Sequence, residues 1–420
     1  MLNPIVYAAP VFLLAMALEW GYGLRKGRQY FRAADTISSL SLGITSQLIG
    51  VFTLSLNVGI YAWAWAHAAL SKLPLDSVWV WIGALLFYDF CYYWLHRLGH
   101  EVAILWAAHA VHHSSEEYNL STALRQTGSG FLLGWLFYLP MAVAGVPPLV
   151  FVTVGLIDLL YQFWVHTRAI DRLGWLDRVF VTPSNHRVHH GQNAYCLDRN
   201  YGGILILWDR LFGTFAEERQ GEPIVYGVLG QLRSWSPLEA NLFHYRQIWR
   251  DALLADNWAD RLSIWFRSPS WRPAAAMRLA PKPAVDLQAF ERFDPPLPAG
   301  LAAYGLVQLF CLLGASVGLL AVMPQLSVWE QALASAGITL SLMMLSWVME
   351  RGRTAMRSEC LRLSIQLVLC AALLANGTSD LGALICETLV LASVLGALQL
   401  ARVHFNLASA PAVPPLNDSA

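Results

Sequence analysis

Long apolar runs constrain this chain more than any other feature. Crossing a bilayer takes an α-helix of about 20 mostly apolar residues. Runs of this kind lie at 4–24, 37–68, 77–96, 129–145, 147–166, 299–323, 328–349, 358–376 and 380–402. Only 13% of the 420 residues are charged, against about 25% in soluble domains. We therefore predict an all-α integral membrane protein, a helical bundle of about nine spans in which the "GVPP" break makes a hairpin of the fourth and fifth.

The distribution of Lys and Arg predicts how this bundle is oriented. The segments "LRKGRQYFR" at 24–32 and "ERGRTAMR" at 350–357 are strongly basic. The connections after the second, fourth, sixth and eighth runs contain almost no Lys or Arg. Because basic loops stay in the cytoplasm, we expect the N-terminus outside and the C-terminus in the cytoplasm. The two large segments 97–128 and 167–298 then share the cytoplasmic face.

The runs also divide the chain into regions. We expect N-terminal spans at 1–76 and a central domain at 77–298, whose polar part after residue 167 forms a helical cap. A four-span module should follow at 299–405, and a disordered tail at 406–420. The block "WDRLFGTF" at 208–215 is expected to be a short helix or turn on the cap. The formal net charge of zero makes nucleic acid an improbable partner.

Histidines are concentrated in three motifs on this predicted face. A His-x-x-x-His pair lies at 96–100, and His-x-x-His-His occurs twice, as "HAVHH" at 109–113 and "HRVHH" at 186–190. Residues three and four apart share one face of a helix, so each motif offers at least two imidazoles to one side. Imidazole binds iron, zinc, copper and nickel, and a single tetrahedral zinc uses about four ligands. We predict a centre for two metals, held by His96, His100, His109, His112, His113, His186, His189 and His190.

The other four histidines fit no motif. His67, His244 and His404 are expected to be ordinary polar residues near span ends or in the cap. His166 stands at the end of the fifth run, where its spacing alone favours neither a ligand nor an interfacial residue.

Two carboxylates lie within apolar runs close to the histidines. Asp89 precedes His96 by seven residues and Asp158 precedes His166 by eight, so each pair shares a helix side. A carboxylate inside a membrane is by default a functional candidate. Both could accept the free N–H of an imidazole and fix the ring, although Asp89 is too far from His96 itself and would serve another ligand. Pairing with a neighbouring helix is the equal alternative.

The order of the three motifs resembles the fatty acid hydroxylase/sterol desaturase superfamily. The flanking sequences agree: "YDFCYYWLHRLGH" at 88–100, "TPSNHRVHHG" at 182–191 and "NYGGILILWDRLFGTF" at 200–215. The resemblance covers roughly 80–220. Within the superfamily it is closest to the alkylglycerol monooxygenase family, through the segments 96–126, 165–167 and 187–215.

That resemblance implies a membrane monooxygenase with a cytoplasmic cap over two iron ions. The eight motif histidines would be ligands and His166 a further one. The co-substrate would be O2, the substrate a membrane lipid hydroxylated beside an ether oxygen. Tetrahydrobiopterin, contacting Glu101, or an external redox protein would supply electrons. Asn119, Arg125 and Gln126 follow the second motif and would either meet a polar head group or form a solvated helix face.

The sequence leaves two alternative functions open. The same iron centre could hydroxylate or desaturate a sterol, a fatty acid or another lipid. A metal transporter could also be rich in histidine, but its ligands should lie near mid-membrane between broken spans. The histidines here gather at span ends and in the connecting segments, which favours an enzyme.

Overall fold

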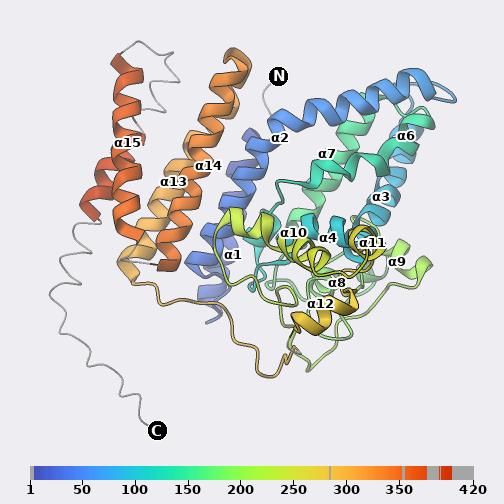
Figure 1. Ribbon diagram of the computed structural model, residues 1–420. Coiled ribbons are helices and arrows are strands. Elements are labelled where there is room, and N and C mark those ends of the chain that lie inside the picture. Colours follow the sequence, from blue (N-terminus) through green and yellow to red (C-terminus); the bar gives the residue numbers. More distant parts are fainter. Residues whose placement is uncertain (1–3, 283–284, 352–354, 376–386, 388, 400–420) are drawn as a thin grey trace, which may run out of the picture. The chain divides into compact units, whose positions relative to one another are not determined.

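The computed structural model describes residues 4–282, 285–351, 355–375, 387 and 389–399. The chain divides into two compact units, Asn3–Asp294 and Pro295–Ala420. Regular structure in the described residues is helical (Figure 1), with two isolated β-bridges and no longer strand, which confirms the all-α prediction. The predicted tail, His404 and about half of the run 380–402 lie outside the described residues.

The helices of the first unit are α1 (Pro4–Arg25), α2 (Ala33–Ala68), α3 (Val78–Glu101), α4 (Ala103–His113), α5 (Leu120–Ala123), α6 (Leu139–Val143), α7 (Pro148–Trp164), α8 (Pro183–His189), α9 (Leu207–Phe212), α10 (Pro237–Leu253), α11 (Trp258–Ser263) and α12 (Ala274–Leu279). The 3-10 helices η1 (Gly130–Leu132), η2 (Gly134–Tyr138) and η3 (Leu176–Arg178) lie between them. The second unit contains α13 (Ala299–Val322), η4 (Met323–Gln325), α14 (Val328–Arg351) and α15 (Met356–Ala375).

Five helices of the described part are long and apolar enough to cross a bilayer: α1, α2, α3, α13 together with η4, and α14. The protein is therefore an integral membrane protein. The predicted span at 129–145 is wrong, because η1, η2 and α6 divide it into short pieces. Hydropathy overlooked Gly130, Gly134 and Pro140, which disfavour a continuous helix. The predicted hairpin of the fourth and fifth spans is therefore wrong too. Its second half, α7, is an apolar helix of 17 residues.

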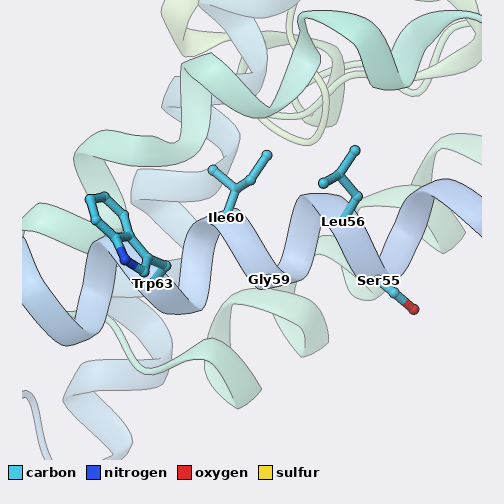
Figure 2. Close-up of a pocket in the computed structure, with 5 residues that line it drawn as sticks. All are labelled: Ser55, Leu56, Gly59, Ile60 and Trp63. Carbon is cyan, nitrogen blue, oxygen red and sulfur yellow. The ribbon is translucent and has the colours of Figure 1, made fainter.

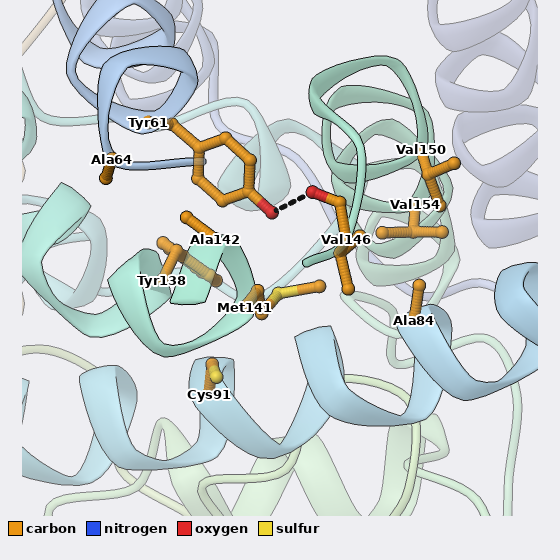
Figure 3. Packing of buried hydrophobic residues seen from close by; sticks show 10 residues of the cluster. All are labelled: Tyr61, Ala64, Ala84, Cys91, Tyr138, Met141, Ala142, Val146, Val150 and Val154. Atoms are coloured by element: carbon orange, nitrogen blue, oxygen red, sulfur yellow. Dashed lines mark hydrogen bonds between the residues drawn. The ribbon is translucent and has the colours of Figure 1, made fainter. Parts of the chain in front are cut away.

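A buried apolar cluster joins α2, α3, α6 and α7 (Figure 3). The Tyr61 hydroxyl donates a hydrogen bond of 2.9 Å to the carbonyl of Val146, so the phenol is buried with its polar end satisfied. The ring of Tyr61 stacks on Phe151 of α7, with centroids 3.9 Å apart. These contacts fix the second half of α2 against the helix that leads to His166.

The outer side of α2 is apolar and exposed. Ser55, Leu56, Gly59, Ile60 and Trp63 line a shallow groove along this side (Figure 2). Exposed patches of this kind mark contact with a partner or a membrane. In a helix of this length and hydropathy, lipid is the expected neighbour.

Helices α3 and α4 bring the first two histidine motifs together. α3 ends at Glu101, and Val102 takes an extended conformation (φ −120°) before α4 begins at once. The sharp break folds α4 back against α3, so the pair at 96–100 faces the motif at 109–113. The predicted short helix at 208–215 is confirmed as α9, which ends at Gly213 in the left-handed conformation (φ 74°).

The second unit has its own buried polar network. Arg362 donates to both carboxylate oxygens of Glu359, at 2.6 and 2.9 Å, and to Gln308 at 2.8 Å. The Tyr304 hydroxyl also donates to Glu359. Because the charges are paired and hydrogen-bonded, this network links α13 to α15.

Candidate metal centre

Nine histidines form two groups whose ring nitrogens converge. The first group is His96, His100, His109, His113 and His189, and the second is His112, His166, His186 and His190. Within each group, one ring nitrogen of every member lies within 4.8 Å of the others. All eight predicted ligands are included, and His166 joins them.

Each His-x-x-His-His motif is divided between the two groups. His109 and His113 of α4 belong to the first group, whereas His112 belongs to the second. In α8 the division is reversed: His186 and its neighbour His190 belong to the second group and His189 to the first. The fourth position of the motif therefore projects away from the other two, and neither motif is a site by itself.

The Nε2 atoms of neighbouring rings approach closely. In the first group the separations are 2.9 Å for His96–His109, 3.1 Å for His109–His113 and 3.1 Å for His113–His189. In the second group they are 3.1 Å for His112–His166, 3.0 Å for His166–His186 and 3.2 Å for His186–His190. The Nε2 of His100 is buried without a hydrogen-bond partner in the described structure.

Backbone carbonyls determine which ring nitrogen carries the hydrogen in four histidines, among them His112 and His166. Nδ1 of His112 donates to the Arg125 carbonyl (3.0 Å), and Nδ1 of His166 donates to the Gln162 carbonyl (2.7 Å). Because a carbonyl only accepts, the hydrogen is on Nδ1 and Nε2 presents a lone pair. The two lone pairs of His112 and His166 thus face one another at 3.1 Å. Such an arrangement is repulsive unless a cation lies between them, so the donor set fits a metal ion.

Burial keeps these rings neutral. It lowers the pKa of His112 to about 4 and holds the pKa of His109, His113, His186 and His190 well below their usual range. Neighbouring imidazoles lower the pKa of the latter four further. The neutral imidazole is the form that binds a metal.

Acid should destabilise the metal-free protein. The folded pKa of His112 lies below the unfolded value of 6.5, so the folded state binds fewer protons, and stability falls as pH drops from 6.5 towards 4. Each such histidine costs about 1.4 kcal/mol per pH unit. We expect a lower unfolding temperature in detergent at about pH 5.5 than at about pH 7.5. The variant His112→Phe should show a shallower decline, and equal slopes would contradict the assignment.

The predicted role of Asp89 and Asp158 as imidazole partners is wrong. Asp89 accepts hydrogen bonds from the backbone of Ile204 and Leu205 and from Trp208 Nε1, at 2.7, 3.1 and 2.8 Å. Asp158 accepts a hydrogen bond from the side-chain amide of Gln162. The backbone carbonyl of Gln162 in turn accepts a hydrogen bond from Nδ1 of His166. Backbone carbonyls bind the Nδ1 atoms of four of the rings. The two carboxylates bind other groups of the protein.

A short loop at 198–202, here called the carbonyl loop, orients two ligands of the first group. The carbonyl of Arg199 accepts from Nδ1 of His189 at 2.9 Å, and that of Tyr201 accepts from Nδ1 of His96 at 2.8 Å. Asp198 and Asn200 take the left-handed conformation, with φ of 57° and 59°. Acidic and amide residues tolerate this conformation better than others, and the alternation turns both carbonyls towards the histidines.

Two buried polar side chains hold the carbonyl loop. Asp209 of α9 accepts from the backbone N–H of Tyr201 (2.7 Å) and Gly202 (2.8 Å). The Asn200 side chain donates to the carbonyls of Asn185 and Ala216, at 2.9 and 2.8 Å. Neither residue was predicted as a site residue from the sequence. The signal was present, since Asp209 interrupts the apolar stretch "ILILW" and a buried carboxylate needs donors.

The structure corrects the proposed head-group residues. Arg125 is 1% exposed and donates to the Val111 carbonyl and the Ser114 hydroxyl. Asn119 is buried and caps α5 by accepting from the backbone of Ser121. These two are therefore neither a head-group site nor a solvated helix face. Gln126 is half-buried and donates to the Ala123 carbonyl.

Other predicted residues have separate outcomes. Glu101, at the end of α3, is 38% exposed and pairs with Arg97 at 3.0 Å. His67 is exposed, as expected, and contacts the Trp63 carbonyl. His244 is buried on α10 against Trp106, which corrects its assignment as an ordinary polar residue.

Comparison with known proteins agrees with this centre. The Fatty acid hydroxylase family model matches residues 81–214, which contain all nine histidines. Human alkylglycerol monooxygenase is 42% identical over 270 residues, which is 63% of this chain and 59% of the human protein. The zebrafish (Danio rerio) alkylglycerol monooxygenase is 38% identical over 360 residues, 85% of this chain and 79% of that protein. No solved structure matches.

The fatty acid hydroxylase domain and the relatives that share it identify the chain as an integral membrane lipid monooxygenase of this superfamily. Within it, the chain belongs to the alkylglycerol monooxygenase family, as its identity to the zebrafish protein and to the protein from Xenopus tropicalis (40% over 69% of that relative) shows.

Proposed function

We propose that this chain is a di-iron monooxygenase that cleaves glyceryl ether lipids. The observation that carries the proposal is the pair of converging histidine groups with lone pairs directed inward. The substrate class comes from the alkylglycerol monooxygenases to which the chain is related. The orientation follows from the basic segments, with the centre and its cap in the cytoplasm.

Five histidines would hold one iron and four the other. Imidazole suits iron, and a five-nitrogen group exceeds the four ligands of a tetrahedral zinc. Bound iron would supply the oxidation of an unactivated C–H bond by O2 with two external electrons. Adding a hydroxyl to the carbon beside the ether oxygen gives a hemiacetal, which collapses to an aldehyde and a glycerol derivative.

The protein's own contribution is orientation and exclusion of water. The carbonyls of Arg125, Gln162, Arg199 and Tyr201 fix the tautomers, so that Nε2 of each ring points inward. Burial of the rings keeps water from the reacting carbon. Because the histidines stay neutral at pH 7, protons do not compete with the metal for their ring nitrogens.

Glu101 is proposed to contact a pterin reductant. It directly follows His100, and its carboxylate is partly exposed at the end of α3. A carboxylate accepts two parallel N–H bonds, which the amino-pyrimidine edge of tetrahydrobiopterin can donate. A residue that binds only the reductant should affect its KM more than the metal content.

The assay is aldehyde release from an alkylglycerol by the purified, iron-loaded protein. We expect product only when O2 and tetrahydrobiopterin are both present, and none from the matching acyl ester. Glu101→Gln should raise the KM for the pterin with iron content unchanged, whereas Glu217→Gln, at an exposed position, should not. If the protein spares alkylglycerols but hydroxylates a sterol or fatty acid, the narrower proposal is wrong and the broader superfamily activity stands.

A further inference from the structure

Helix α10 exposes an apolar stripe on the side away from its packed face. Its packed face includes Ala240 and His244. The stripe consists of residues spaced four, seven and four apart, which fall on one side of a helix: Leu238, Leu242, Trp249 and Leu253, each at least 40% exposed. Such a stripe on a helix that is already packed needs a second apolar neighbour.

Helix α11 and the residues after it extend this surface. Trp258, Leu262 and Phe266 are spaced four residues apart and are 72%, 64% and 69% exposed. The rings of Trp249 and Trp265 lie 6.4 Å apart, so the stripe of α10 lies beside the residues that directly follow α11. We call the stripe together with Trp258, Leu262 and Phe266 the α10–α11 surface.

This surface lies where α2 changes from a buried to an exposed helix. The backbone of Gly128 donates to Asn241 of α10 at 2.8 Å, and a Cβ on Gly128 would lie 2.7 Å from Ile49 of α2. Up to Leu48 much of α2 is buried, whereas Leu54 and Leu56 are exposed. At about 1.5 Å per residue, the stretch from Ile49 to the end of α2 is about 30 Å long. In the view of Figure 1, α10 and the part of α2 that leads to α3 run across the page, whereas α3 and α7 run from top to bottom.

Cationic side chains accompany the surface. Arg246 and Arg250 are exposed beside the stripe, and Arg261 lies over the ring of Trp258 at 5.0 Å. The segment 237–282 contains seven Arg or Lys and four Asp or Glu. Trp and Arg together are typical of helices in the interface of a bilayer, where the ring lies among the lipid carbonyls and the cation meets phosphate.

We propose that the α10–α11 surface lies in the membrane, with its apolar side chains in the interface of a leaflet that contains anionic phospholipid. Gly128 links α10 to Ile49, near the point where α2 becomes exposed. The opposite side of α10 carries His244, whose ring centroid lies 5.8 Å from that of Trp106 in a tilted arrangement. The ring centroid of Trp106 lies 5.0 Å from that of His100. The bilayer would then be separated from the first histidine group by one helix and one aromatic layer.

Spin labels at single cysteines test this placement. Leu242→Cys, Trp249→Cys and Leu262→Cys probe the surface, and Glu217→Cys, exposed on a polar loop, is the control. The full chain, with Cys311, Cys360 and Cys386 replaced by Ser, is reconstituted in vesicles of phosphatidylcholine and phosphatidylglycerol. Collision rates are measured with O2, which concentrates in lipid, and with a water-soluble nickel chelate. Metal content confirms that each variant is folded.

The three possible outcomes separate the three possible neighbours. A ratio of O2 to nickel collisions several-fold higher at the surface positions than at Glu217→Cys supports the proposal. A ratio equal to the control means that water covers the surface, which overturns it. Low collision rates with both reagents mean that protein covers it, either the second unit or another copy, which overturns it equally.

Discussion

Replacing His113 by Ala should remove one metal ion per chain and lower turnover by more than about 100-fold, since even residues that only support a ligand change affinity or activity by 10–100-fold. His113 Nε2 lies within 3.1 Å of both His109 and His189, in the middle of the first group. His190→Ala should remove the other ion, because its Nε2 belongs to the second group. Metal per chain, measured by mass spectrometry, and aldehyde release check both results.

The control is His67→Ala, which changes an exposed histidine on α2 and should leave both quantities intact. His166→Ala is the most informative member of the series, because it lies in neither His-x-x-His-His motif. It should behave as His190→Ala does. Full metal content with normal turnover in His166→Ala would remove it from the ligand set.

Replacing Asp209 by Ala should disable the first histidine group and spare the second. Three donors lose their acceptor: the backbone N–H of Tyr201, that of Gly202 and the hydroxyl of Thr214. Each unsatisfied buried donor costs about 1–3 kcal/mol, so the carbonyl loop should shift. We expect metal affinity at the first group to fall about 10–100-fold, because the loop orients His96 and His189.

Asp256→Ala is the matched control, since its carboxylate is 68% exposed and pairs with the exposed Arg278. Asp209→Asn keeps the shape and one acceptor oxygen, so its effect should be intermediate. A loss of metal from the first group alone distinguishes a positioning role of Asp209 from a general loss of protein stability. An equal loss of metal from both groups would show that Asp209 supports the fold rather than the first group.

The spacing of the histidines made the centre predictable, because separations of three and four residues have a direct meaning on a helix. The division into groups of five and four was not predictable. It depends on contacts such as His166–His186, and on the reversal between α4 and α8. His166 has no local partner in the sequence that marks it as a ligand.

The remaining differences have physical causes. Hydropathy counted the apolar residues at 129–145 but gave no weight to glycine and proline. Asp89 was expected to accept from an imidazole, yet the backbone amides of Ile204 and Leu205 occupy it. Arg125 was expected either to meet a polar head group or to lie on a solvated helix face, but Ser38, Ser39 and Asp35 of α2 surround its guanidinium. Which polar group meets which donor is a tertiary property.

The central claim is that two irons occupy two separate histidine groups. Anomalous diffraction at the iron absorption edge, from crystals of the iron-loaded protein, tests it most directly. We expect two peaks per chain, one among His96, His100, His109, His113 and His189 and the other among His112, His166, His186 and His190. A single peak, or iron bound away from these histidines, would contradict it.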